Sequence, residues 1–182
     1  MITLYTIKIA LRGVSPMVWQ CLHLSGITSL AQFHHIIQLA MEWDDDNLHH
    51  FRIYAKNYGI YRRSGANFAV NPYEIFLDDF QFELGDRFVY SYNYFDNHVH
   101  DIRVEAVETI GQNKCPLRCI AGKRLTSLGS WTPAELLFEP ISSVKNLTVG
   151  ELIERLTFIA ENCKQPVFSI HKVNQRLFDA GR

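Results

Sequence analysis

The sequence predicts an α+β domain: a curved antiparallel sheet with one long helix packed on it and a helical C-terminal segment. Segments that alternate between apolar and polar residues dominate residues 2–110, and such alternation is typical of half-buried strands. One capped amphipathic stretch interrupts these segments early in the chain. Strong helix-start signals then gather in the last third of the sequence, and strands followed by helices favour the α+β class.

Length and composition fit one domain, with a core at residues 1–131 and a helical segment at residues 132–182. The net charge of −1 argues against strong non-specific nucleic-acid binding through global charge, but it allows a local basic patch. The first residues alternate like a strand and carry no secretory signal, and no apolar stretch approaches membrane-spanning length. We therefore expect a cytoplasmic protein with reduced cysteines and no membrane partner.

The chain opens with two strands. Residues 2–11 alternate so that Ile7, Ile9 and Leu11 face the core. Gly13 breaks this strand, and residues 18–24 form the next one with partly buried faces. Because only a turn separates the two strands, we expect them to pair antiparallel.

The first helix begins at Ser29, and Gln32 completes its capping box. Asp44, Asp45 and Asp46 oppose the helix dipole, so we expect them in a solvated turn before a third strand. The apolar stripe of the helix consists of Leu30, Phe33, Ile37, Ala40 and Met41, and His34, His35, Gln38 and Glu42 lie mostly off it.

Residues 48–54 form that third strand, and residues 55–80 lack a pattern, which indicates a long loop or an irregular hairpin packed by its aromatic side chains. Residues 88–94 and 99–110 form a hairpin of long strands, and residues 115–121 could add another strand. Tyr90, Tyr92 and Tyr94 share one face of the first hairpin strand. This face is either packed under a helix or, if open, lines a ligand groove.

Helix signals return at Thr132, which starts a short helix. Residues 148–163 form the best-specified helix, with Thr148 and Glu151 as a capping box, and we expect it to dock on the domain as a C-terminal lid. A last short helix at residues 169–178 places Ile170, Val173 and Leu177 against the domain.

Spaced residues in four places form a recognisable pattern. They are Pro16-x-Val18-Trp19 after the opening strand; Phe33-His34, Gln38, Trp43-Asp44 and Leu48-His49-x-Phe51; Leu84-Gly85-Asp86, Tyr90-x-Tyr92, Asp96 and His100; and Cys119-x-x-Gly122. This pattern resembles the plasmid pRiA4b open-reading-frame-three-like family, whose members are domains of unknown function sometimes carried by plasmids and insertion elements. The resemblance spans roughly residues 2–131 and implies an α+β fold, but it implies no known activity.

The chain also departs from that family. Asn93, Phe95 and His98 replace the family's Asp, Gly and Trp, and residues 126–131 stand where relatives have an acidic, glycine-rich segment. The resemblance therefore implies that any role of that segment in relatives is lost or changed in this chain.

Asp96, His98 and His100 alternate, so an extended chain places them on one face, where two imidazoles and a carboxylate can bind a metal ion. His34 and either His49 or His50 could approach this face if the first helix packs over the sheet. The alternative is that Asp96 and Asn97 form a turn and that the histidines are structural, and the residue types favour this alternative. The cysteines lack the paired spacing of a zinc site, so we expect inert thiols, no metal and no cofactor.

A basic stretch without acidic residues runs from Thr109 to Ala134 and includes Lys123 and Arg124, with Trp131 close by. Such a stretch can contact single-stranded nucleic acid through phosphate attraction and base stacking, or it can be an ordinary basic surface. We expect a non-enzymatic binding domain with a nucleic-acid or protein partner. The alternative is a metal-dependent enzyme that uses Asp96, His98 and His100.

Overall fold

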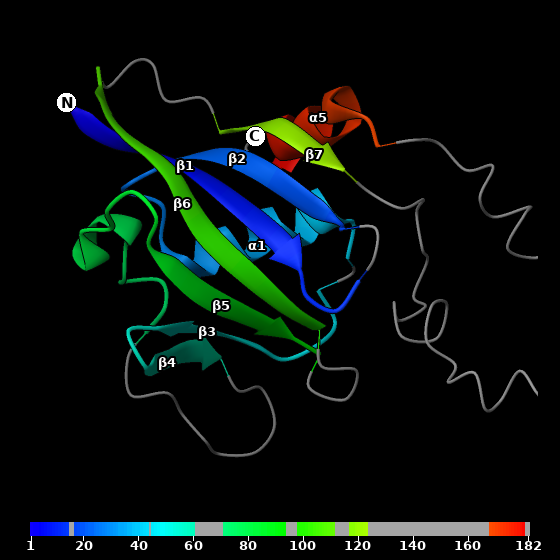
Figure 1. Cartoon of the computed structure of the whole chain (residues 1–182), viewed down its shortest axis with the longest axis horizontal. Helices are drawn as coiled ribbons and strands as arrows, with labels where there is room; N and C mark the ends of the chain where they lie inside the picture. Colours follow the sequence, from blue (N-terminus) through cyan, green and yellow to red (C-terminus); the bar gives the residue numbers. More distant parts are fainter. Residues whose placement is uncertain are drawn as a thin grey trace, which may run out of the picture.

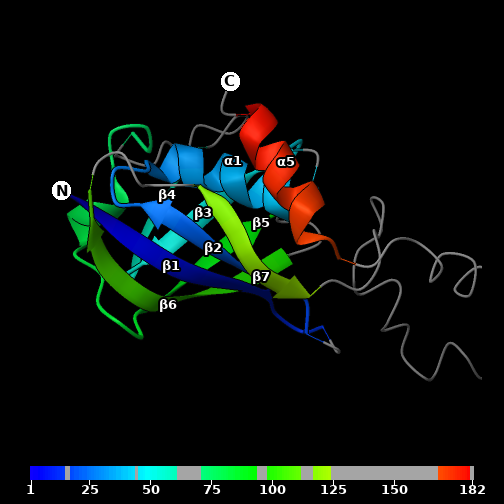
Figure 2. The same ribbon diagram turned by 90° about the horizontal axis from the view of Figure 1, so that it is seen from above.

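The computed structural model describes residues 1–14, 17–43, 45–60, 71–93, 98–111, 117–123 and 168–180. These residues form an antiparallel sheet of seven strands in the order β4-β3-β5-β6-β1-β2-β7, so the α+β class is confirmed (Figure 1). The strands are β1 (Ile2–Leu11), β2 (Trp19–Ser25), β3 (His49–Ile53), β4 (Lys56–Ile60), β5 (Arg87–Tyr92), β6 (His98–Ile110) and β7 (Arg118–Lys123). Helices α1 (Leu30–Met41) and α5 (Ile170–Ala180) both lie on one face of the sheet (Figure 2).

The β1 strand lies at the centre of the sheet, antiparallel to both β2 and β6. Ile7 and Ile9 are fully buried on the face that α1 covers, while Lys8 between them points to the opposite face. The alternation read from the sequence is therefore confirmed for this strand, and so is its antiparallel pairing with β2.

Helix α1 forms as its sequence predicts because its first turn is capped within the chain. The Ser29 hydroxyl accepts the Gln32 backbone N–H at 3.2 Å, and the Gln32 side chain accepts the Ser29 backbone N–H at 3.0 Å. Phe33 packs on the sheet with its ring centroid 5.4 Å from that of Phe51. The helix ends at Glu42, whose φ of 58° is left-handed.

None of the helices that the structure describes has the length and apolar character needed to span a membrane.

Helix α5 rests on β7 and on α1. Val173 and Leu177 are buried, as predicted, but Ile170 is 41% exposed, so the prediction that it packs on the domain is wrong. Ile170 precedes Val173 by three residues and lies on the same side of the helix, but it belongs to the first turn, whose residues are exposed.

The structure refines two strand predictions. Residues 56–60 form β4, which pairs with β3 through a turn at Tyr54 and Ala55, whose φ values of 47° and 64° are both positive. Of the two alternatives predicted for residues 55–80, a long loop or an irregular hairpin, the structure shows a hairpin at residues 56–60, and its pairing with β3 is regular. The predicted strand at residues 115–121 is displaced to Arg118–Lys123.

The helices expected after Thr132 and at residues 148–163 lie outside the described residues. The predicted division at residue 131 lies outside them too.

Candidate functional site

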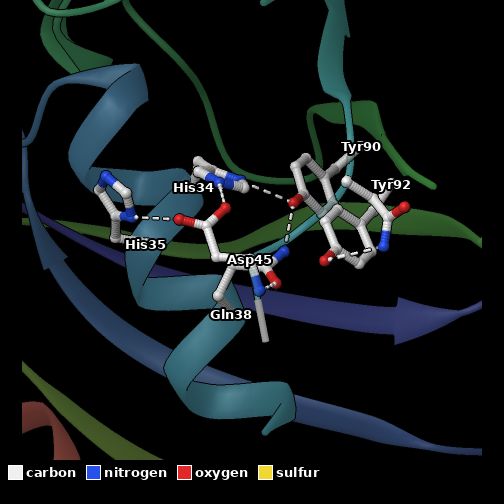
Figure 3. Close-up of polar contacts among 7 residues, drawn as sticks. His34, His35, Gln38, Asp45, Tyr90 and Tyr92 are labelled. Carbon is white, nitrogen blue, oxygen red and sulfur yellow. Dashed lines mark hydrogen bonds and ion pairs between the residues drawn. The ribbon is translucent and has the colours of Figure 1, made fainter. Parts of the chain in front are cut away.

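Polar side chains from α1, β3 and β5 meet beneath the C-terminal half of α1. We call His34, Gln38, Asp45, His49 and Tyr90 the histidine cluster. Figure 3 shows His34, Gln38, Asp45 and Tyr90. The imidazoles of His34 and His49 stack with ring centroids 3.4 Å apart and planes 7° from parallel. Both rings are buried, so the sheet and the helix hold them in this arrangement.

Hydrogen bonds connect His34, Gln38, Asp45 and Tyr90, and His49 stacks on His34. His34 Nδ1 lies 2.8 Å from the Tyr90 hydroxyl, and Gln38 Nε2 donates to the same hydroxyl at 2.8 Å. On its other side, His34 Nε2 lies 2.5 Å from Asp45 Oδ1. The neighbouring His35 adds an ion pair, since its Nδ1 lies 3.2 Å from Asp45 Oδ2 (Figure 3).

The turn after α1 brings Asp45 back to the helix. Glu42 and Asp45 both have positive φ, which reverses the chain direction. The backbone N–H of Trp43 donates to the Gln38 carbonyl at 2.9 Å, and the N–H of Asp45 donates to the Gln38 side chain at 3.3 Å. The predicted turn is present, and Asp46 in it is exposed. The Asp45 carboxylate is only partly exposed because it faces His34 and His35.

Trp43 links the histidine cluster to β6. Its ring lies 4.7 Å from Tyr92, 4.5 Å from His98 and 5.2 Å from His100, measured between centroids. His98 and His100 thus share a face, as the alternation predicts. Asp96 lies outside the described residues, so the predicted metal-dependent site of these three residues stays a prediction.

His100 is fully buried, and neither ring nitrogen has a hydrogen-bond partner. Burial is the main reason that its pKa falls to about 3, and His98 lowers it further, while backbone groups of Tyr90 and His98 act in the opposite direction. The imidazole is therefore neutral at pH 7.

The other face of the sheet carries a row of cations. Arg103 on β6 lies directly opposite Lys8 on β1 and directly opposite Arg87 on β5. Opposed residues in neighbouring strands share a face, so three positive charges stand side by side across three strands. Arg103 is 3.8 Å from Glu105, an exposed ion pair that offsets only part of this repulsion.

The row continues on β2 and β7, where Lys123 lies directly opposite Trp19 and Lys8 Nζ lies 4.5 Å from the centroid of the Trp19 ring. We call Lys8, Trp19, Arg87, Arg103 and Lys123 the basic face. Arg124 and Trp131, which the sequence also selects, lie outside the described residues.

Cys21 and Cys119 are buried free thiols. Burial raises the pKa of Cys21, and it raises that of Cys119 to about 11, so neither is a thiolate at neutral pH. Cys115 and Cys163 lie outside the described residues.

The fold and the site define a small α+β domain whose helix covers a buried polar cluster. The chain belongs to the plasmid pRiA4b ORF-3-like family, whose model matches residues 3–128. It is also similar to the crystal structure of a protein of unknown function from Methanosarcina mazei Go1, with a TM-score of 0.69, 21% identity and coverage of 94% of this chain and 97% of that one. That likeness shows the fold. None of the curated proteins compared with the sequence matches it.

The family pattern and the histidine cluster coincide. The pattern residues that lie in the cluster or against it are His34, Gln38, Trp43, His49, Tyr90, Tyr92 and His100. Pattern residues that lie far apart in the sequence therefore meet at one place in the fold. Sequence reasoning selected His34, His49, Tyr92 and His100 as candidate binding residues. It named Gln38 and Tyr90 in the family pattern, and Tyr90 also on a face that could line a groove, but it gave Asp45 no role in a site. Gln38 follows His34 by four residues on the helix, and that spacing could have shown that the two share a face.

Proposed function

We propose that this domain binds nucleic acid through the basic face, with phosphates as the main contact. The observation that carries the proposal is the row formed by Arg87, Arg103 and Lys8. Like charges placed directly opposite each other destabilise a sheet, and here one arginine has a cation on both sides. An anionic partner that spans three strands converts this repulsion into attraction.

A polyanion fits this face better than a single small anion, because the positive charges extend from β5 to β7. No described helix covers this side of the sheet, as Figure 2 shows. The whole chain has a formal net charge of −1, so the positive charge is local and not a property of the whole surface. A family named after a plasmid-encoded protein is consistent with a nucleic-acid partner.

The substitution Arg103→Gln should change the affinity for nucleic acid and the stability of the fold in opposite directions. It removes the central charge of the row while keeping a polar side chain of similar length. We expect the free energy of unfolding to rise by about 0.2–1 kcal/mol, because two like-charge pairs disappear. We expect the affinity for a labelled single-stranded oligonucleotide to fall, and its salt slope to decrease by about one, as for the loss of one phosphate contact. Fluorescence anisotropy across a salt series and urea denaturation measure the two effects.

Lys172→Gln is the matched control, since Lys172 is an exposed cation on α5, on the helical side of the sheet. It should leave binding unchanged. The pair Lys123→Glu and Arg124→Glu should weaken binding more than Arg103→Gln, because it reverses two charges. If the wild-type protein binds neither single- nor double-stranded oligonucleotides at low salt, or if Arg103→Gln binds as tightly as the wild type, the basic face has no such role.

A further inference from the structure

Three side chains converge beside α1 at a point that the proposed nucleic-acid contact does not use. The carboxylate of Asp45 lies between the imidazoles of His34 and His35, with the 2.5 Å and 3.2 Å contacts given above (Figure 3). One ligand atom from each of the three residues lies within 4.8 Å of the other two. Two imidazole nitrogens and one carboxylate oxygen are a common donor set for metal ions in proteins.

We propose that His34, His35 and Asp45 bind one divalent first-row transition-metal cation, such as Zn²⁺. Metal–ligand bonds of about 2.0–2.1 Å in a tetrahedral site place ligand atoms roughly 3.3 Å apart. His35 Nδ1 already lies at about this distance from Asp45 Oδ2, whereas His34 Nε2 contacts the other oxygen, Oδ1. A cation bound to one of these oxygens therefore requires the carboxylate to rotate or shift, and Asp45 can supply that movement because it is in a turn outside the helix.

The donor types select the class of cation. Imidazole suits Zn²⁺, Fe²⁺, Co²⁺ and Ni²⁺, whereas Mg²⁺ and Ca²⁺ prefer sites made of oxygen atoms. His34, His35 and Asp45 offer no thiolate, which disfavours the softer Cu⁺. The site is therefore specific for a class of cation and not for divalent charge alone.

The surroundings of His34 match those of a metal ligand. Histidine ligands normally use the second ring nitrogen in a hydrogen bond that fixes the orientation of the ring. Nδ1 of His34 has such a partner in the Tyr90 hydroxyl, which Gln38 also holds. The His49 ring stacks on His34 and restrains it further. Nε2 is thus oriented toward Asp45 before any cation binds.

A small cavity adjoins the three ligands and has a volume of about 40 Å³. One water occupies about 30 Å³ in the liquid, so the cavity has room for a water bound to the cation. Three protein ligands and one water is the arrangement of open zinc sites. The cavity is lined by Ala31, His34, His35, Asp45, Asn47, Leu48, His49 and Tyr73.

Isothermal titration of the chelator-treated protein with Zn²⁺ tests the site. We expect one equivalent to bind to the wild type. We expect the affinity to fall at least tenfold in His35→Ala, which removes one donor, and in Asp45→Asn, which replaces the carboxylate with a neutral amide oxygen that is a much weaker ligand. The His35 side chain is 53% exposed, so its truncation leaves the core intact, and circular dichroism can verify this. Titration with Co²⁺ adds an independent readout, because the visible absorption of a bound ion reports its nitrogen and oxygen ligands.

His171→Ala controls for adventitious binding, since His171 is an exposed histidine on α5. It should bind Zn²⁺ as the wild type does. His98→Ala distinguishes this site from the predicted site at Asp96, His98 and His100, and it too should leave binding unchanged. The inference is overturned if the wild type binds no cation, if His35→Ala binds as tightly as the wild type, or if His98→Ala or His171→Ala loses the cation instead.

Discussion

At the scale of single residues, His100 is the least compensated polar group in the described core. Its ring lies between Tyr90 and Trp43, with centroids 5.5 Å and 5.2 Å away, and both ring nitrogens are without a hydrogen-bond partner. Among the charged groups around it, His98 lowers its pKa and Asp101 raises it, but burial dominates. Charging this imidazole is therefore costly in the folded state and easy in the unfolded state.

This difference predicts how stability depends on pH. The unfolded histidine titrates near pH 6.5, whereas the folded one titrates near pH 3. Between these values the unfolded state binds more protons, so acidification favours unfolding, by on the order of 1 kcal/mol per pH unit for this residue. This loss of folding stability begins as pH falls through about 6.5 and is complete near pH 3. Urea denaturation of the wild type and of His100→Leu between pH 7 and pH 4 measures it.

The comparison isolates His100 because the other titrating groups are the same in both proteins. We expect the wild type to lose stability faster than His100→Leu as pH falls. Parallel profiles would show that His100 takes up its proton in the folded state as easily as in the unfolded chain.

The residue scale also shows what a local pattern cannot reveal. His34 and Gln38 were predicted to lie off the apolar stripe of the first helix, yet each is only 3% exposed. They can be buried because Tyr90, more than fifty residues away, supplies the hydroxyl that both contact. The sequence selected His34 and His49 as residues that could meet, but it could not specify the partner that makes their burial favourable.

At the scale of elements, one side chain joins α5 to the edge of the sheet. The Asn174 side chain accepts the backbone N–H of Cys119 at 2.6 Å and donates to its carbonyl at 2.9 Å. These are the bonds that a neighbouring strand would make with β7. The amide thus substitutes for a strand at this position and fixes where the helix docks.

Asn174→Ala should lower the free energy of unfolding by about 1–3 kcal/mol, because it leaves the backbone groups of Cys119 without partners. Alanine also favours the helix, so the measured loss understates the value of the contact. Gln175→Ala is the control, since Gln175 is exposed on the same helix. Urea denaturation compares the variants, and equal stabilities for the two would mean that solvent replaces the Asn174 bonds without loss.

The elements that the sequence predicted well are those whose signals are local. The capping box at Ser29 and the alternation in β1 lie within a few residues, and both were correct. The choice between a loop and a hairpin at β4 stayed open because its turn uses Tyr54 and Ala55, whereas turns with two positive φ values favour Asn and Gly. The start of β7 was misplaced by three residues, since its register depends on β2, almost one hundred residues earlier.

At the scale of the whole molecule, the sheet separates the two proposed sites. The histidine cluster lies under α1, and the basic face lies on the opposite side of the same strands (Figure 2). The sequence predicted local hairpins, but it could not place β1 between β2 and β6, because Leu11 pairs with His100 across eighty-nine positions. That pairing brings Arg103 beside Lys8, so the basic face depends on a contact that no local pattern reveals. The histidine cluster depends in the same way on the pairing of β3 with β5, which brings His49 and Tyr90 under the helix.

The strand order also predicts a gradient of local stability. The β1 strand has partners on both sides along its length and carries the fully buried Ile7 and Ile9. The β4 strand pairs only with β3 among the described strands, and Lys56 and Asn57 are exposed. An amide exchanges slowest if its hydrogen bond breaks only when the whole fold opens, whereas amides in an edge strand exchange through local fraying. In hydrogen exchange followed by mass spectrometry, peptides of β1 should keep their protons longest and peptides of β4 should lose them first. Equal protection of the two would mean that β4 opens only with the whole sheet, so that the β3–β4 hairpin belongs to the same cooperative unit as the central strands.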